Sequence, residues 1–304
     1  MSTLLNSWLL RLGRPGSSAS QGITGNPAPV HRMLKSNRTP RRFAVHPSRR
    51  VILLAALWLG IALSTTVLFA ADLPPSATGE PLRVGVSPVF PPMVFKQGKD
   101  LVGVEVDMAR VLGSYLGRPV VFVEVPWKDP IEALNNKRTD IIMSSMSITE
   151  ARRFVLSFSQ PYFVVGQMAL VRRENKHKYL LGFPLNLKAP IAVIPATTGD
   201  FLIQRDYPKT KRVNCKDGAA GVEALVRKKA ELFFADSTLI WYLAGMHAAD
   251  GLTVAPMTLS EEQLAWGVRK TDDALLAAVN TFITQARQNG TFLKVFQRWT
   301  SIGN

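Results

Sequence analysis

The clearest structural signal in this chain lies in residues 82–125, LRVGVSPVFPPMVFKQGKDLVGVEVDMARVLGSYLGRPVVFVEV. The apolar run at 82–86 predicts a buried strand. Residues 105–116 carry apolar side chains at helical spacing, and the β-branched run at 120–125 predicts a second strand. Short apolar strands separated by an amphipathic helix are typical of a mainly parallel sheet with helices on both faces.

The alternation of strands and helices continues and then restarts after a loop at 184–188. The predicted elements are a helix at 130–136, a strand at 140–143, a strand at 191–194, a helix from 198 to 205, a strand at 211–215, a helix at 221–228, a strand at 232–235, a helix at 272–288 and a last segment at 292–299. Residues 72–304 are therefore expected to form two α/β lobes, an architecture in which small ligands bind between domains.

The first 71 residues have a different composition from the rest of the chain. They hold nine Lys and Arg and no acid, which leaves 28 basic against 22 acidic residues for the remainder. An uncharged run, VILLAALWLGIALSTTVLFAA, occupies residues 51–71 and follows these positive charges, as in an export signal. Because such a run is long enough to cross a bilayer as a helix, an uncleaved membrane anchor is the alternative.

The composition also excludes several classes of protein. One cysteine, Cys215, rules out a disulfide scaffold. Only His177 and His247 lie outside the basic leader, so no metal site is expected. The sequence contains no phosphate-binding glycine loop and no recognisable catalytic triad, and the basic excess lies mostly in the leader. We therefore expect neither a cofactor nor a nucleic-acid partner.

Several motifs in order resemble the extracytoplasmic solute-binding proteins of family 3, the polar amino-acid receptors of ABC importers. The similar segments are LRVGVSPVFPP (82–92), LVGVEVDMA (101–109), Trp127, Ala133-Leu134, DIIMSSMSITEAR (140–152), FSQPY (158–162), LAWGVRK (264–270) and NGT (289–291) through to Trp299. The resemblance covers nearly the whole part of the chain that follows the leader.

The resemblance implies an α/β, two-lobed periplasmic-binding-protein fold of type II. Each lobe would be a mixed sheet flanked by helices, with the ligand cleft at a two-strand hinge that lets the lobes close on the ligand. The implied parts are a leader with a signal peptide or anchor (1–71), lobe 1 (81–166 and 264–304) and lobe 2 (167–263). It also implies a periplasmic monomer that docks on a permease in the inner membrane.

The resemblance also implies which residues hold the two charged groups of an amino acid. Arg152 stands where the family places the arginine that binds the ligand carboxylate, and a guanidinium fork can hold both oxygens. Ser144, Ser145 and Ser147 would add hydrogen bonds. In lobe 2, Thr198 matches a carboxylate-binding threonine at a helix start, and Asp236 matches the acid that receives the ammonium; each is alternatively a helix N-cap. Ala196 replaces a glycine usual in the family.

Specificity is predicted from the other side of the pocket. Where receptors for basic amino acids carry an acid, this chain has Ser87, and Phe90, Met93 and Trp127 complete that side. Phe90 and Trp127 are candidates to stack on a ligand side chain. We therefore expect a neutral polar or apolar amino acid, or a related small molecule, rather than Lys, Arg or His.

Two alternatives stay open from the sequence. Periplasmic cyclohexadienyl and arogenate dehydratases resemble this family and need a carboxylic acid in the cleft to assist loss of water, a role for which Asp200 and Glu150 are the candidates. The other alternative is a sensory binding module that stays tied to the membrane by residues 51–71.

Overall fold

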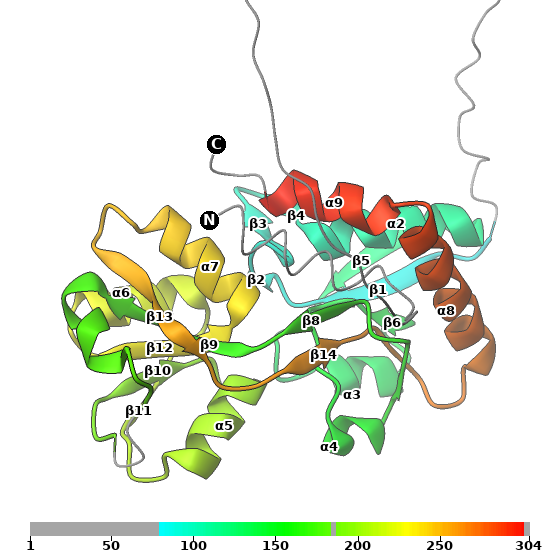
Figure 1. Cartoon of the computed structure of the whole chain (residues 1–304). Coiled ribbons are helices and arrows are strands. Elements are labelled where there is room, and N and C mark those ends of the chain that lie inside the picture. Colours follow the sequence, from blue (N-terminus) through cyan, green and yellow to red (C-terminus); the bar gives the residue numbers. More distant parts are fainter. Residues whose placement is uncertain (1–78, 184–186, 301–304) are drawn as a thin grey trace, which may run out of the picture. The chain divides into compact units, whose positions relative to one another are not determined.

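The computed structural model describes residues 79–183 and 187–300 (Figure 1). These belong to one compact unit of the chain, Phe69–Asn304. The predicted export signal or anchor at 51–71 and part of the predicted loop at 184–188 lie outside the described residues. Within the described ranges, every helix is too short or too polar to cross a bilayer.

The first sheet belongs to lobe 1 and has the strand order β5-β1-β6-β15-β7. Its strands are β5 (Val120–Glu124), β1 (Leu82–Val86), β6 (Ile141–Ile142), β15 (Gly267–Val268) and β7 (Ser157–Phe158). Strand β1 pairs in parallel with β5 and β6, whereas β15 is antiparallel to β6 and β7. The mixed sheet that the resemblance implies is confirmed. The mainly parallel sheet expected from the strand pattern alone is corrected, because β15 enters this sheet in the opposite direction after the chain has built the second sheet.

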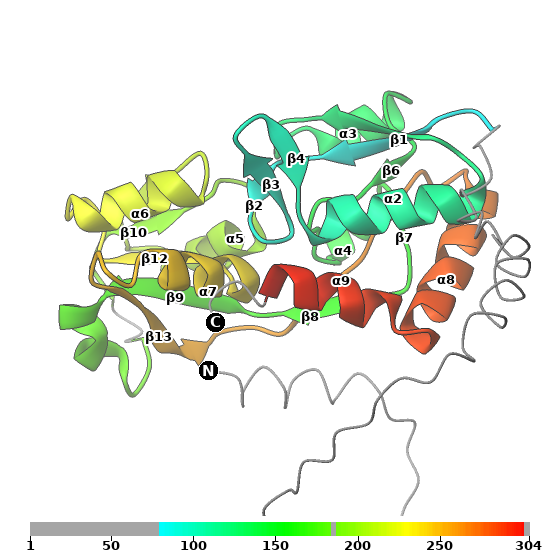
Figure 2. The same cartoon turned by 90° about the horizontal axis from the view of Figure 1, so that it is seen from above.

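Helices and a small sheet complete lobe 1. The helices are α2 (Val104–Leu116), α3 (Pro130–Asn135), α4 (Glu150–Arg153), α8 (Asp273–Gln288) and α9 (Thr291–Thr300). Figure 2 shows α9 beside both α2 and α8. The small sheet joins β2 (Val89–Phe90), β3 (Val94–Gln97) and β4 (Asp100–Val102).

Helix α2 shows how the sequence sets an element's bounds. It begins after Gly103, whose φ is 126° and where a Cβ atom would lie 2.4 Å from Met93 O, so only glycine fits this close approach. It ends at Gly117, whose backbone adopts the left-handed conformation typical of helix C-termini. Two acids, Glu105 and Asp107, lie in the first turn, where the helix dipole favours negative charge.

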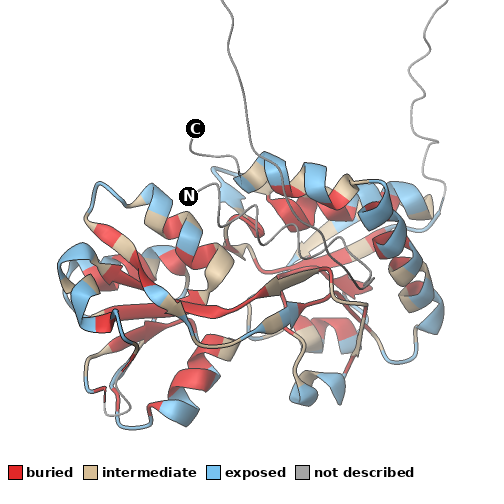
Figure 3. Ribbon diagram, in the orientation of Figure 1, coloured by how far each residue is buried: buried red, intermediate tan, exposed pale blue. Residues whose placement is uncertain are grey.

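The second sheet belongs to lobe 2 and has the order β11-β10-β12-β9-β13. Its strands are β11 (Arg212–Asn214), β10 (Ile191–Val193), β12 (Leu232–Asp236), β9 (Gln167–Arg172) and β13 (Leu252–Thr258). Strand β10 is parallel to β11 and β12, and β9 is antiparallel to β12 and β13. The covering helices are α5 (Thr198–Asp206), α6 (Gly218–Val226), α7 (Ser237–Met246) and the 3₁₀ helix η2 (Arg173–Tyr179). Figure 3 shows mostly buried strands and exposed outer faces of the helices.

Two strands carry the chain between the sheets. Strand β8 (Phe163–Val165) runs toward the second sheet and β14 (Glu262–Leu264) runs back. They pair antiparallel, with Glu262 opposite Val165 and Leu264 opposite Phe163 (Figure 1). We call this pair the hinge ladder. The expected two-strand hinge is confirmed, and every helix and strand that the sequence predicted is present within a few residues of its predicted bounds.

Candidate functional site

A cavity lies between residues of the two lobes, with about 320 Å³ of empty space that includes space open to solvent. The lining residues are Phe90, Trp127, Ser145, Ser147, Arg152, Ile194, Thr197, Thr198, Ala235 and Asp236. The cavity therefore brings together a guanidinium, a carboxylate, four hydroxyl groups and an apolar side.

Arg152 enters the cavity from α4. This short helix begins because Thr149 accepts a hydrogen bond from Arg152 N at 3.2 Å. The guanidinium donates from Nη1 to Ser147 O at 2.8 Å, and its Cζ lies 5.4 Å from the ring centre of Trp127. Burial lowers the pKa of Arg152, and the nearby carboxylates of Asp236 and Glu262 act in the opposite direction. A poorly solvated cation of this kind gains strongly from an incoming anion.

Ser145 and Ser147 line the cavity beside Arg152, on the chain that follows β6. Ser145 has a φ of 55°, and its buried Oγ has no hydrogen-bond partner among the described residues. Ser147 donates its hydroxyl to Glu262 Oε2 at 2.7 Å. The hydroxyl of Ser145 is thus available to a ligand, whereas that of Ser147 already has a protein acceptor.

The start of α5 forms one part of the wall that lobe 2 supplies. Thr197 caps the helix by accepting from Asp200 N at 3.2 Å, and Thr198 is its first residue. Ala196 precedes them in the left-handed region with φ 63°, and its N–H donates to Asp200 Oδ2 at 3.1 Å. A helix start provides free N–H groups and a favourable dipole for an anion.

Asp236 closes strand β12 and lines the cavity. Gln167 Nε2 donates to Asp236 Oδ1 at 2.6 Å and to Thr198 Oγ1 at 3.1 Å. Loss of solvent around the carboxyl group and the nearby Glu262 raise the pKa of Asp236 to about 7, although Gln167 and Arg152 oppose the shift. The carboxylate makes no capping bond to α7 in the described structure, so the N-cap alternative does not account for it.

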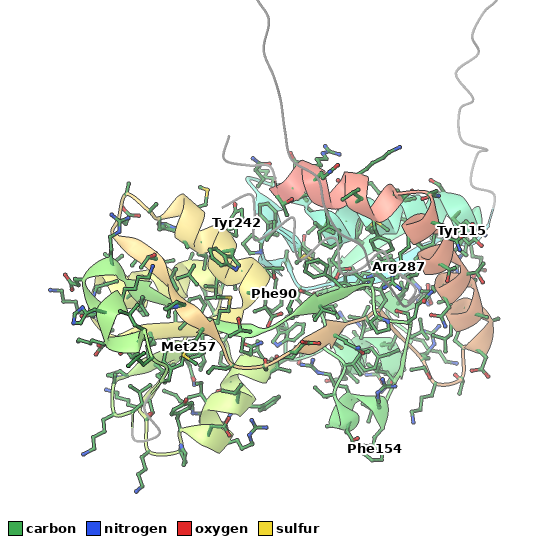
Figure 4. The ribbon with its side chains drawn as sticks, viewed as in Figure 1. Phe90, Tyr115, Phe154, Tyr242, Met257 and Arg287 are labelled. Atoms are coloured by element: carbon green, nitrogen blue, oxygen red, sulfur yellow. The ribbon has the colours of Figure 1, made fainter. Side chains whose placement is uncertain are left out.

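Aromatic rings cover another side of the cavity. Phe90 and Trp127 meet edge to face with ring centres 4.8 Å apart. Figure 4 labels Phe90. Trp127 Nε1 donates to Ala196 O at 3.2 Å, which joins lobe 1 to lobe 2 at the cavity. Met93 is fully buried in the hydrophobic core and is not among the lining residues.

Two of the predicted serines do not line the cavity. Ser87 and Ser144 are both 1% exposed, and Ser144 Oγ accepts from Ser87 N at 2.8 Å. Ser87 in turn donates its hydroxyl to Val125 O at 2.8 Å. These bonds connect the ends of neighbouring strands, so both serines support the loops that carry other site residues.

The two acids considered for catalysis also lie outside the lining. Asp200 is buried and pairs with Arg212 Nη1 at 2.5 Å, in addition to its bond with Ala196 N. Glu150 is an exposed residue in the first turn of α4. Among the described residues, no group of three or more His, Cys, Asp or Glu side chains could hold a metal ion.

Several residues of the site were missed from the sequence. Thr197, Ile194 and Ala235 line the cavity, while Gln167 and Glu262 hydrogen-bond to lining residues. A glutamine at the start of a strand has no distinctive pattern, which explains why Gln167 went unnoticed. Thr197 had a readable signal, because Thr-x-x-Asp at a strand-to-helix turn is a helix-capping pattern.

Comparisons with known proteins agree with this architecture. Residues 82–302 match the family model described as bacterial extracellular solute-binding proteins, family 3. A probable histidine-binding protein of Neisseria gonorrhoeae is 26% identical over 257 residues, which cover 80% of this chain and 94% of that protein. The L-cystine-binding protein TcyJ of Escherichia coli (strain K12) is 26% identical over 224 residues, covering 72% and 82%.

Among solved structures, the ancestral amino acid-binding protein AncCDT-1, a precursor of cyclohexadienyl dehydratase, is similar with a TM-score of 0.65. It is 31% identical, and the match covers 72% of this chain and 94% of that one. The two mixed sheets, the hinge ladder and these matches together establish the family: this chain belongs to the bacterial extracellular solute-binding proteins of family 3 and has the two-lobed periplasmic-binding-protein fold of type II.

Proposed function

We propose that this protein captures a free α-amino acid in the cavity between its lobes and delivers it to an ABC importer. The observation that carries the proposal is that Arg152 and Asp236, from different lobes, line one cavity. An α-amino acid presents a carboxylate and an ammonium on one carbon, and burying both requires a cation and an anion close together.

In this proposal the ligand carboxylate binds the Arg152 fork, with the hydroxyl of Ser145 and the start of α5 at Thr198 as further donors. The ammonium binds the carboxylate of Asp236, which Gln167 holds in place through a 2.6 Å hydrogen bond. The ligand would bond to groups of both lobes in place of solvent. Because these bonds form together only when the lobes are closed, ligand binding favours closure about the hinge ladder.

The side chain of the ligand would face Phe90, Trp127 and Ile194. Arg152 and Asp236 are the only charged residues in the described lining, and both are assigned to the backbone groups of the ligand. A neutral side chain therefore fits best, and Lys, Arg and His are predicted to compete poorly. The relatives named above include a probable histidine-binding protein and an L-cystine-binding protein.

The proposal extends to the rest of the chain. Lobe 1 comprises residues 81–166 and 264–304, lobe 2 comprises 167–263, and residues 1–71 direct export to the periplasm, with or without a retained anchor. The closed monomer would then dock on a permease in the inner membrane. Family membership supports this location and partner.

The dehydratase alternative is supported by one observation, the similarity to a precursor of cyclohexadienyl dehydratase. Asp200 and Glu150 lie outside the described cavity lining, so neither is placed to donate a proton to a bound substrate. The one acid in the described lining, Asp236, is assigned to the ligand ammonium, so binding without turnover is the function that the geometry favours.

A thermal-shift screen of the full-length protein tests the proposal. The panel contains the twenty common L-amino acids, simple amines, small organic acids, prephenate and arogenate. A ligand at about 100 times its Kd stabilises the folded state by about 2.7 kcal/mol, which is easily detected. We expect a shift with one or a few neutral amino acids. A shift only with compounds that lack an α-amino acid group would refute the proposal, and consumption of prephenate or arogenate would show an enzyme.

A further inference from the structure

One buried carboxyl group lies outside the cavity and contacts the backbone of its wall. Glu105, in the first turn of α2, is 1% exposed. Its Oε1 accepts from Ser145 N at 2.9 Å and from the hydroxyl of Tyr162, and its Oε2 accepts from Trp266 Nε1 at 2.8 Å. Three donors from three distant parts of the sequence thus converge on one side chain.

The first of these donors belongs to the proposed ligand site. Ser145 has a left-handed backbone, with φ 55°, which is costly for a residue other than glycine. Its Oγ is the buried hydroxyl that has no partner among the described residues, and the residue lines the cavity. The hydrogen bond from Ser145 N to Glu105 holds the backbone in this conformation, and the conformation sets the direction of Oγ.

The other two donors flank the hinge ladder. Tyr162 immediately precedes β8, and Trp266 lies two residues after the end of β14. Tyr162 N also donates to Leu264 O at 2.9 Å. The rings of Tyr162 and Trp266 stack with their centres 5.3 Å apart. Glu105 is therefore bonded to the points where β8 leaves lobe 1 and where the chain returns to lobe 1 after β14.

We propose that Glu105 is a positioning residue that fixes Ser145 in the cavity wall and joins it to the root of the hinge ladder. The inference rests on the proposed function, because it assigns Ser145 a role in ligand binding. Glu105 itself does not contact the ligand. It acts through the backbone of Ser145, and the affinity for amino acids therefore depends on a side chain outside the cavity.

A carboxylate suits this role better than a neutral amide. Both of its oxygens accept hydrogen bonds, so all three donors are satisfied at once. Glutamine would keep one accepting oxygen and turn an NH₂ group toward a donor. The helix start favours the anion, whereas burial opposes it and raises the pKa of Glu105 to about 7. Loss of the carboxylate would leave at least one buried donor unpaired.

Asp107 provides a matched control on the same helix. Its Oδ2 accepts from Trp299 Nε1 at 2.9 Å and from Arg298 at 3.2 Å, so it also binds an indole N–H, but it fixes the C-terminal helix α9 rather than the cavity. Asp107→Asn should lower thermal stability without altering ligand affinity. Glu105→Gln should change both.

The experiment compares the full-length wild type with Glu105→Gln, Glu105→Asp and Asp107→Asn. Without any ligand, NMR of isotope-labelled protein reports the backbone carbon shifts of Ser145 and the indole N–H of Trp266. We expect both Glu105 variants to shift both signals, and Asp107→Asn to leave them unchanged. Glu105→Asp keeps the negative charge, so it serves as a second variant if Glu105→Gln does not fold. Its shorter side chain cannot reach Ser145 N and Trp266 Nε1 together, so it also breaks at least one of these bonds.

Affinity for the twenty common L-amino acids is measured in the same set of variants. For every amino acid that binds the wild type, Glu105→Gln should weaken binding about tenfold, since roughly one hydrogen bond to the ligand is misplaced. Adding Ser145→Ala should cause little further loss. Unchanged Ser145 signals, or equal affinities in Glu105→Gln and Asp107→Asn, would overturn the inference. If the wild type binds no amino acid, the proposed function fails, and the NMR comparison still decides whether Glu105 positions Ser145.

Discussion

Replacement of Arg152 gives the sharpest prediction about the cavity. Arg152→Ala removes the only cation of the described lining. The carboxylate of a bound ligand would then be buried in the cavity without a positive partner. Removing one partner of a buried ion pair costs about 3–5 kcal/mol, which corresponds to a loss of affinity of roughly two to four orders of magnitude. Arg152→Lys keeps the charge but loses the fork, and we expect an intermediate loss.

The free protein should be affected much less. Arg152 donates one hydrogen bond to Ser147 O and packs over Trp127, contacts worth about 1–2 kcal/mol together, and its removal also relieves the burial of a charge. Calorimetric titration of the full-length variants with the amino acid found by screening measures affinity, and thermal unfolding measures stability. Arg153→Ala, on an exposed neighbour, is the control and should bind like the wild type. Similar binding by Arg152→Ala and Arg153→Ala would refute the assignment.

Three further predictions concern other parts of the cavity. Because the carboxyl of Asp236 has a raised pKa of about 7 and must be ionised to bind an ammonium, affinity should be full above pH 7 and fall up to about tenfold per unit below it; a flat profile from pH 8 to 5 would contradict this assignment. Trp127→Phe deletes the hydrogen bond to Ala196 O but keeps an aromatic ring, so stopped-flow measurements should show that the ligand dissociates about three- to tenfold faster. An unchanged dissociation rate would contradict the view that this bond helps to hold the lobes together. Ala196→Gly relieves the backbone strain of an alanine in the left-handed region and should raise the free energy of unfolding by up to about 1 kcal/mol in denaturant titrations. Ala192→Gly, within β10, is the control and should lower the free energy of unfolding.

Much of the fold could be predicted from the sequence because it depends on local patterns. Strand β1, helix α2 and helix α8 have clear periodicity and lie where it placed them. The direction of β15 had no such signal, since two residues, Gly267 and Val268, cannot reveal their neighbours. Their pairing with β6 depends on the chain's return through the hinge ladder, which is a long-range property.

The candidate site was predictable where residues carry distinctive chemistry. Arg152 and Asp236 stand out as charged residues at element boundaries, and both line the cavity. Ser87 has the same local appearance as a site residue, yet its hydroxyl bonds to Val125 O, and only the tertiary structure shows this. Glu105 went unnoticed because an acid in the first turn of a helix usually faces solvent; its burial follows from packing against Tyr162 and Trp266.

The central claim is that the cavity recognises the α-carboxylate and the α-ammonium of an amino acid together. The most direct measurement is calorimetric titration of the full-length protein with the amino acid of largest thermal shift, its α-carboxamide and its N-acetyl derivative. We predict binding of the parent amino acid and at least about 100-fold weaker binding of each derivative, because each leaves Arg152 or Asp236 without its partner. Equal affinity for all three compounds would contradict the account.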